Sequence, residues 1–139
     1  MFDQLIYIST AQHALPRREL PIILDSSQRN NRLAGVTGML LFDGIRFLQA
    51  LEGAPGAVAR IFARIRADAR HRAAVVLSQR PVAAREFGNW AMAYEDNRAA
   101  PGAVSLIDMV EALVTTVENR NTRELFRSFA RVDRYVARV

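Results

Sequence analysis

A glutamine, a tyrosine and a pair of asparagines are the side chains of this sequence whose placement suggests chemistry. Gln49 stands in the run IRFLQAL, where strand alternation places it on one face with Ile45, Phe47 and Leu51. An amide among apolar residues needs hydrogen-bond partners, because leaving it unpaired costs about 1–3 kcal/mol. The sequence therefore predicts a polar group beside Gln49, supplied by the protein or by a bound molecule.

Tyr7 and the two asparagines are expected on the same side as Gln49. Tyr7 lies in the strand-like run LIYIS, while Asn30 and Asn31 follow Ser27 by three and four residues on one helix face. Taken singly, Tyr7 is typical of a core-edge tyrosine and Asn31 of a helix C-terminus. A glutamine amide both donates and accepts, so it can bridge a phenol and a polar ring. Three polar groups converging on one covered face favour a polar ligand.

The apolar periodicity predicts the elements that must position these groups. We expect strands at 5–9, 36–42, 45–51, 73–78 and 89–94, and helices at about 16–31 and 55–68. Asp43-Gly44 between two apolar runs is a strong hairpin signal. The order β-α-β-β-α-β-β predicts an α+β, ferredoxin-like fold with a mixed sheet and two helices on one face.

Two more helices are predicted after residue 104. Ser105 can cap the first, and Asn121-Thr-Arg-Glu124 is a capping-box pattern for the second. Their apolar stripes are sufficient to cover the other face of the sheet, beneath Ile6, Ile8 and Leu48, or to bind a second copy. We divide the chain into a sheet domain at 1–96 and a helical extension at 97–139.

Composition narrows the function classes. The chain has 139 residues, no cysteine, and a net charge of +5 carried by arginine without lysine. Half of the residues are hydrophobic and about a quarter are charged, as in an ordinary globular domain. The arginines are scattered among acids, so nucleic acid is not an expected partner. We expect no disulfide, no metal site, no membrane span and no signal peptide, and a cytoplasmic protein.

An ordered set of motifs resembles the BLUF domains, blue-light sensors that use FAD. The set comprises LIYIS, SSQRNN, GVTGMLLFDGIRFLQALEG, then Arg64, Ile65, Asp68 and an Arg-His pair, and finally NWAM. The resemblance covers about residues 2–96. It implies the fold already predicted, with the flavin ring inserted between the two helices against the sheet.

The resemblance also implies roles for individual residues. Tyr7 would be the light-driven electron and proton donor, and Gln49 would bridge it to the flavin. Asn31 would hydrogen-bond the polar edge of the ring. Further cofactor contacts would come from Ile23, Ser27, Asn30, Arg64, Ile65, Asp68 and His71. Trp90 and Met92 match the last-strand pair that relays the signal.

The function implied is a photoreceptor without catalytic turnover. It would signal through the last strand and the C-terminal helices to a partner protein or to its own oligomer. The matching residues hold mainly the ring and the ribityl chain, so FAD, FMN and riboflavin all stay open in the isolated protein. Two alternatives are a small ferredoxin-like flavin enzyme or phosphate hydrolase, based on Arg64 and His71, and a cofactor-free adaptor built on the terminal helices.

Overall fold

The structure is a computed structural model of the 139-residue chain. It describes residues 1–11, 20–42, 45–68, 71–87, 93–96, 110–112, 114–115 and 117–136. The Asp43-Gly44 turn, Ser105, Trp90 and Met92 lie outside this description.

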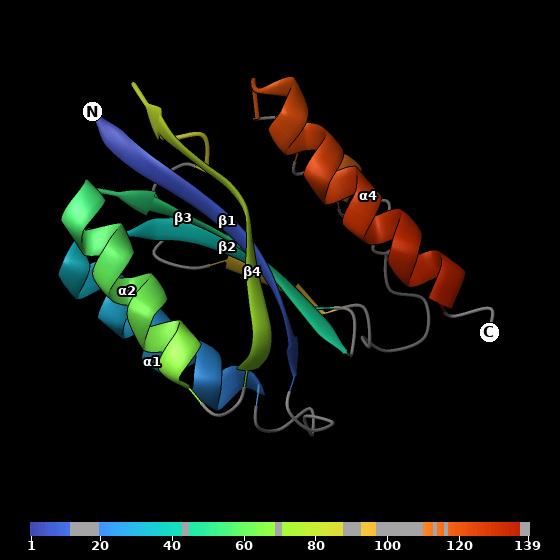
Figure 1. The fold of residues 1–139 in the computed structure, drawn as a ribbon, viewed down its shortest axis with the longest axis horizontal. Coiled ribbons are helices and arrows are strands. Elements are labelled where there is room, and N and C mark those ends of the chain that lie inside the picture. The colour runs from blue at the N-terminus through green and yellow to red at the C-terminus, as the bar shows by residue number, and fades with distance from the viewer. Residues whose placement is uncertain are drawn as a thin grey trace.

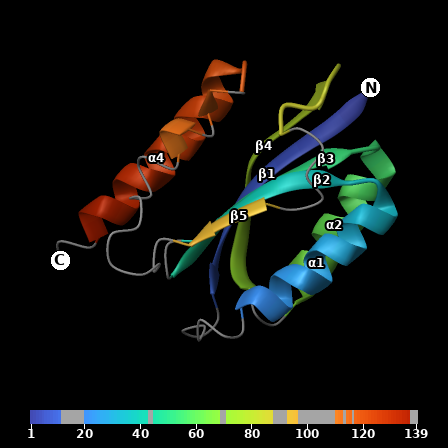
Figure 2. The same ribbon diagram turned by 180° about the vertical axis from the view of Figure 1, so that it is seen from behind.

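A five-stranded sheet forms the centre of the molecule, with the order β4-β1-β3-β2-β5 (Figure 1). The strands are β1 (Phe2–Ala11), β2 (Thr37–Phe42), β3 (Arg46–Gly53), β4 (His71–Val82) and β5 (Ala93–Asp96). β1 is antiparallel to β3 and to β4, and β2 is antiparallel to β3. β5 is parallel to β2, as Figure 2 shows, so the sheet is mixed.

Helices cover both faces of this sheet. α1 (Leu20–Ala34) and α2 (Pro55–Ala67) lie on one face, and α4 (Arg120–Val136) lies on the other (Figure 1). The predicted ferredoxin-like α+β fold, with C-terminal helices on the outer face, is therefore confirmed.

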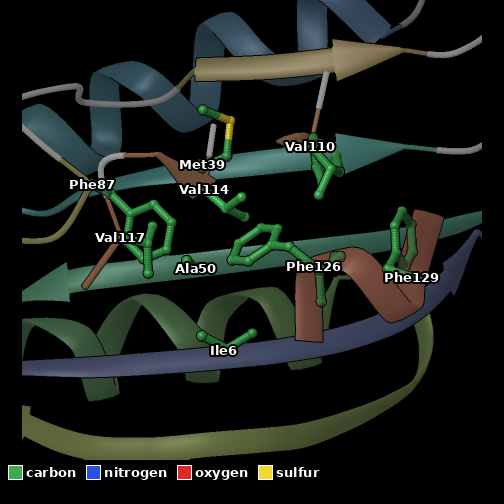
Figure 3. Packing of buried hydrophobic residues seen from close by; sticks show 11 residues of the cluster. Ile6, Met39, Ala50, Phe87, Val110, Val114, Val117, Phe126 and Phe129 are labelled. Carbon is green, nitrogen blue, oxygen red and sulfur yellow. The ribbon is translucent and has the colours of Figure 1, made fainter. Parts of the chain in front are cut away.

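Strand alternation divides the apolar residues into two cores. On the α1/α2 side, Leu5, Tyr7 and Leu51 pack against residues of α2. On the α4 side, Ile6, Leu48 and their neighbours meet the C-terminal helical residues. Figure 3 shows this outer core: Ile6, Met39, Ala50, Phe87, Val110, Val114, Val117, Phe126 and Phe129. Because both faces are buried, β1 and β3 are apolar on both sides.

Several boundaries differ from the sequence predictions. β1 and β4 are longer than expected, since they pair with each other from Phe2↔Val82 to Ala11↔His71. The described part of the last strand begins at Ala93, later than the predicted residue 89. The predicted capping box at Asn121 was wrong. α4 begins earlier, at Arg120. Its cap is Asn119, whose Oδ1 atom accepts the Thr122 N–H at 3.0 Å.

Candidate functional site

Tyr7 and Gln49 form a hydrogen-bonded pair across two central strands. β1 and β3 place them directly opposite each other. Because side chains alternate along a strand, both point to the α1/α2 side, opposite to Ile6 and Leu48. The Tyr7 hydroxyl donates to Oε1 of Gln49, and both side chains are buried. The polar partner that the sequence required for Gln49 is therefore in part Tyr7.

The surroundings of Tyr7 keep its phenol neutral. The ring packs against Phe62 of α2, with centroids 5.1 Å apart. Burial raises the pKa of Tyr7 well above its usual range, and the negative charge of Asp68 raises it further. A neutral phenol keeps its proton for the hydrogen bond to Gln49.

A cavity of about 120 Å³ opens beside this pair, between α1 and α2. Its floor is formed by β2 and β3 and its walls by the two helices. The lining residues are Ser26, Ser27, Asn30, Asn31, Leu40, Phe47, Gln49, Ile61, Arg64, Ile65 and Asp68. The cavity is thus surrounded by side-chain amides, serine hydroxyls and apolar side chains. A cation and a carboxylate, both near the end of α2, complete its lining.

The end of α1 positions the asparagine pair. Gly35 adopts a left-handed conformation with φ +70, and its N–H bonds to the Arg32 carbonyl at 3.2 Å. This turn is typical of glycine after a helix. The Asn31 carbonyl then accepts the Val36 N–H at 2.8 Å, which fixes the last helical turn to the start of β2. As a result the Asn31 side chain is buried at the cavity.

The second wall follows from the start and end of α2. Pro55 occupies the first turn, where its missing N–H has no partner to lose. Ile61 is buried, and Ile65 is half-buried one turn later on the same stripe. The helix stops at Asp68, whose N–H bonds to the Ile65 carbonyl at 3.1 Å. Arg64 and Asp68 therefore both reach the cavity from the last turn of α2.

Most residues singled out from the sequence meet at this cavity: Ser27, Asn30, Asn31, Gln49, Arg64, Ile65 and Asp68. Tyr7 adjoins it through Gln49. Ile23 belongs to α1 and His71 begins β4, but their side chains are not described.

Four lining residues were missed by the sequence reasoning: Ser26, Leu40, Phe47 and Ile61. Three of them could have been found, each from a different signal. Leu40 is paired with Gln49 in the β2–β3 hairpin, and Phe47 shares the face of Gln49. Ile61 lies on the predicted buried stripe of α2. Apolar residues that line a ligand are hard to distinguish from core residues, because their patterns are the same.

The cavity fits a flat heterocycle with a polar edge. Apolar side chains from the sheet and α2 supply walls for a ring, as in most cofactor sites. The amides of Asn30, Asn31 and Gln49 can each donate and accept, which matches a ring edge that carries both kinds of group. Arg64 is exposed at the rim, where it suits a phosphate. The donor set is therefore compatible with a flavin nucleotide.

The fold and this site define a small α+β domain with a cavity between two helices that suits a planar cofactor. Residues 2–93 match the family model for BLUF, "Sensors of blue-light using FAD". The chain belongs to this family, and it is a blue-light sensor domain whose cofactor is FAD.

Curated relatives agree with the family. The chain is 36% identical over 85 residues to the photoactivated adenylate cyclase subunit alpha of Euglena gracilis, which covers 61% of the chain and 8% of that relative. It is 36% identical over 98 residues to the blue light- and temperature-regulated antirepressor BluF of Escherichia coli K12, which covers 70% of the chain and 24% of that protein. The matched segment is thus a small part of these longer relatives.

Solved structures show the same fold. BlrB, described as a BLUF protein in its dark state, is 29% identical with a TM-score of 0.72, and the match covers 94% of this chain and 96% of BlrB. Klebsiella pneumoniae BlrP1 with FMN and cyclic diGMP is 30% identical with a TM-score of 0.78, over 94% of this chain and 34% of BlrP1. Among the described residues, no helix has the length and apolar character needed to cross a membrane.

Proposed function

We propose that Tyr7 and Gln49 are the photoactive pair of this blue-light sensor. The observation that carries the proposal is the buried hydrogen bond from the Tyr7 hydroxyl to Oε1 of Gln49, at the wall of a cavity lined by amides. Bound FAD supplies the absorption of blue light and an acceptor for one electron.

Tyr7 would give up the electron, and its phenolic proton would move along the existing hydrogen bond toward Oε1 of Gln49. Both the electron and a proton would then return to Tyr7, so that no net oxidation remains. Burial favours this coupling, because a charged phenol in this environment is costly. The Gln49 amide can then rotate or tautomerise, which reverses the donor and acceptor presented to the cavity. The two arrangements of the Gln49 amide would give the buried hydrogen-bond network two alternative states, one in the dark and one after illumination.

Other side chains would hold the cofactor. On the α1 side we assign Ile23, Ser27, Asn30 and Asn31, with Asn31 on the polar edge of the ring. On the α2 side we assign Ile65 to the ring and Arg64, Asp68 and His71 to the ribityl-phosphate part. The geometry that supports these assignments is the joint lining of one cavity by most of them.

The test is the absorption spectrum of the purified, flavin-loaded protein before and after blue light. We expect a reversible red shift that is lost in Tyr7→Phe and in Gln49→Ala, although both variants still bind FAD. A matched control is Ser9→Ala, since Ser9 is a buried residue on the same face of β1 but is not among the cavity residues. A shift that survives Tyr7→Phe would falsify the assignment.

We also propose how the sensor gives its output. Residues 1–96 would form the light-sensing unit without turnover of its own, and residues 97–139 would be the extension that changes packing. Trp90 and Met92 would relay the signal from the last strand. The partner would be a second copy of the chain or a downstream protein in the cytoplasm. Size measurements in dark and light, before and after truncation at Asp96, test this output.

A further inference from the structure

A second buried hydrogen-bonded pair joins the same two strands on the opposite face. Gln4 and Glu52 are cross-strand partners in the β1–β3 ladder, as are Tyr7 and Gln49. Gln4 lies three residues before Tyr7 on β1, and Glu52 lies three residues after Gln49 on β3. Both separations are about 10 Å along the strand. Nε2 of Gln4 donates to Oε2 of Glu52 at 2.8 Å, and both side chains are completely buried. Because side chains alternate along a strand, a separation of three residues places Gln4 and Glu52 on the opposite face, toward α4.

Glu52 holds the segment that follows β4. Its Oε2 atom also accepts the Glu86 N–H at 2.9 Å, and its Oε1 atom accepts the Phe87 N–H at 2.9 Å. Arg85 adds a bond to the Glu52 carbonyl oxygen at 2.8 Å, and it reaches Gly35 at the end of α1 at 2.9 Å. Residues 85–87 are thus attached to the end of β3 by several hydrogen bonds.

Glu86 continues the chain of contacts to α4. Its Oε1 atom accepts from Gln4 at 3.0 Å and is paired with Arg80. Its Oε2 atom accepts the backbone N–H groups of Glu118 and Asn119, each at 3.1 Å, immediately before α4 begins. A carboxylate at a helix N-terminus is stabilising, because it satisfies free N–H groups and interacts with the helix dipole.

An apolar contact runs beside this polar one. The ring of Phe87 lies 5.5 Å from the ring of Phe126 on α4, and both belong to the outer core in Figure 3. Residues 86 and 87 therefore contact α4 in two ways, while their backbone is fixed to Glu52.

We infer that Gln4, Glu52 and Glu86 are positioning residues that carry the state of the Tyr7–Gln49 pair to the N-terminus of α4. The inference rests on the proposed photoactive pair. A rearranged Gln49 displaces β3 relative to β1, and Gln4 and Glu52 span those two strands. A buried carboxylate keeps its hydrogen bonds where water cannot replace them, so residues 86 and 87 follow β3. Light then makes or breaks the hydrogen bonds that Glu86 accepts from the backbone of residues 118 and 119.

The test is hydrogen exchange of backbone amides 118–123, measured in dark and under blue light together with the flavin spectrum. In the wild type we expect light to change this exchange about two- to fivefold, the effect of losing a carboxylate at a helix N-terminus. In Glu86→Ala the red shift should remain, because Glu86 lies on the opposite face from the cavity, whereas the light-dark difference should disappear.

Two further variants separate relay from simple support. Gln4→Leu leaves the Glu86 contact with α4 in place, so dark exchange should match the wild type while the light-dark difference becomes smaller. Glu111→Ala removes an exposed ion pair between Glu111 and Arg127 of α4 and should leave the difference unchanged.

The outcomes distinguish this inference from the photoactive pair. A flavin-loaded wild type without a red shift contradicts the proposed function. A wild type that shifts but shows equal exchange in dark and light at 118–123 overturns the relay alone. So does a full light-dark difference in both Glu86→Ala and Gln4→Leu.

Discussion

At the residue scale, Tyr7 combines complete burial with a hydrogen bond to the side chain of Gln49. Burial excludes water from its hydroxyl, and the hydrogen bond directs its proton toward Oε1 of Gln49. Phe62 packs against the ring, and Asp68 adds negative charge nearby. These neighbours disfavour a phenolate and leave a neutral phenol as the resting form.

The pKa of Tyr7 leads to a prediction about alkaline stability. Because the pKa is raised in the folded state above its usual value of 10.0, the unfolded chain releases this proton first as the pH rises. The stability contribution is complete below about pH 10 and is lost above it. We expect the free energy of unfolding to fall above pH 10 more steeply than in Tyr7→Phe, by up to about 1.4 kcal/mol per pH unit. Urea unfolding between pH 8 and 11 measures this, and parallel curves would contradict it.

At the element scale, the β2–β3 hairpin places Gln49 through a close approach at Gly38. A Cβ atom added to Gly38 would overlap the backbone carbonyl oxygen of Ala50, which adjoins Gln49. We therefore expect Gly38→Ala to lower the free energy of unfolding by about 1–3 kcal/mol, the usual cost of overpacking. It should also weaken the light-induced shift by displacing β3.

Gly56→Ala is the matched control for this prediction. A Cβ atom added to Gly56 would lie 3.4 Å from Nη1 of Arg60, the end of a flexible side chain on α2. Alanine is also the better helix former, so this variant should be neutral or slightly stabilised. Equal unfolding midpoints in urea for Gly38→Ala and Gly56→Ala would refute the steric argument.

These elements also show how far the sequence alone could lead. Alternation placed Tyr7 and Gln49 on one face, and their exact pairing follows from the β1–β3 register. The length of β4 was not predictable from its apolar run, because pairing with β1 extends it in both directions. Leu40 was missed because a cavity-lining leucine has the pattern of a core residue. The cluster of Gln4 and Glu52 was missed because its carboxylate interacts with residues distant in sequence.

At the scale of the whole molecule, the sheet separates the proposed cofactor site from the proposed output helix. The cavity proposed for FAD lies between α1 and α2. α4, the proposed output helix, packs on the other face of the sheet (Figure 1). β1 and β3 offer a route for a signal across the sheet, because these central strands contribute to both cores. A rigid, doubly covered sheet suits this purpose, since close-packed interiors transmit small displacements.

If the cavity is the cofactor site, the stability of the whole domain depends on FAD. The buried amides and apolar walls would contact a flavin in the folded state only, so FAD should stabilise the fold by mass action. We expect the free energy of unfolding in the dark to rise by about 1.4 kcal/mol for each tenfold increase in free FAD above the dissociation constant.

Asn31→Ala should move the onset of this rise to higher FAD concentrations, because it removes a buried amide of the cavity. Glu111→Ala, on the exposed side of the terminal helices, should leave the onset unchanged. Urea unfolding at fixed FAD concentrations measures both, and an unfolding midpoint independent of FAD would contradict the cavity as the cofactor site.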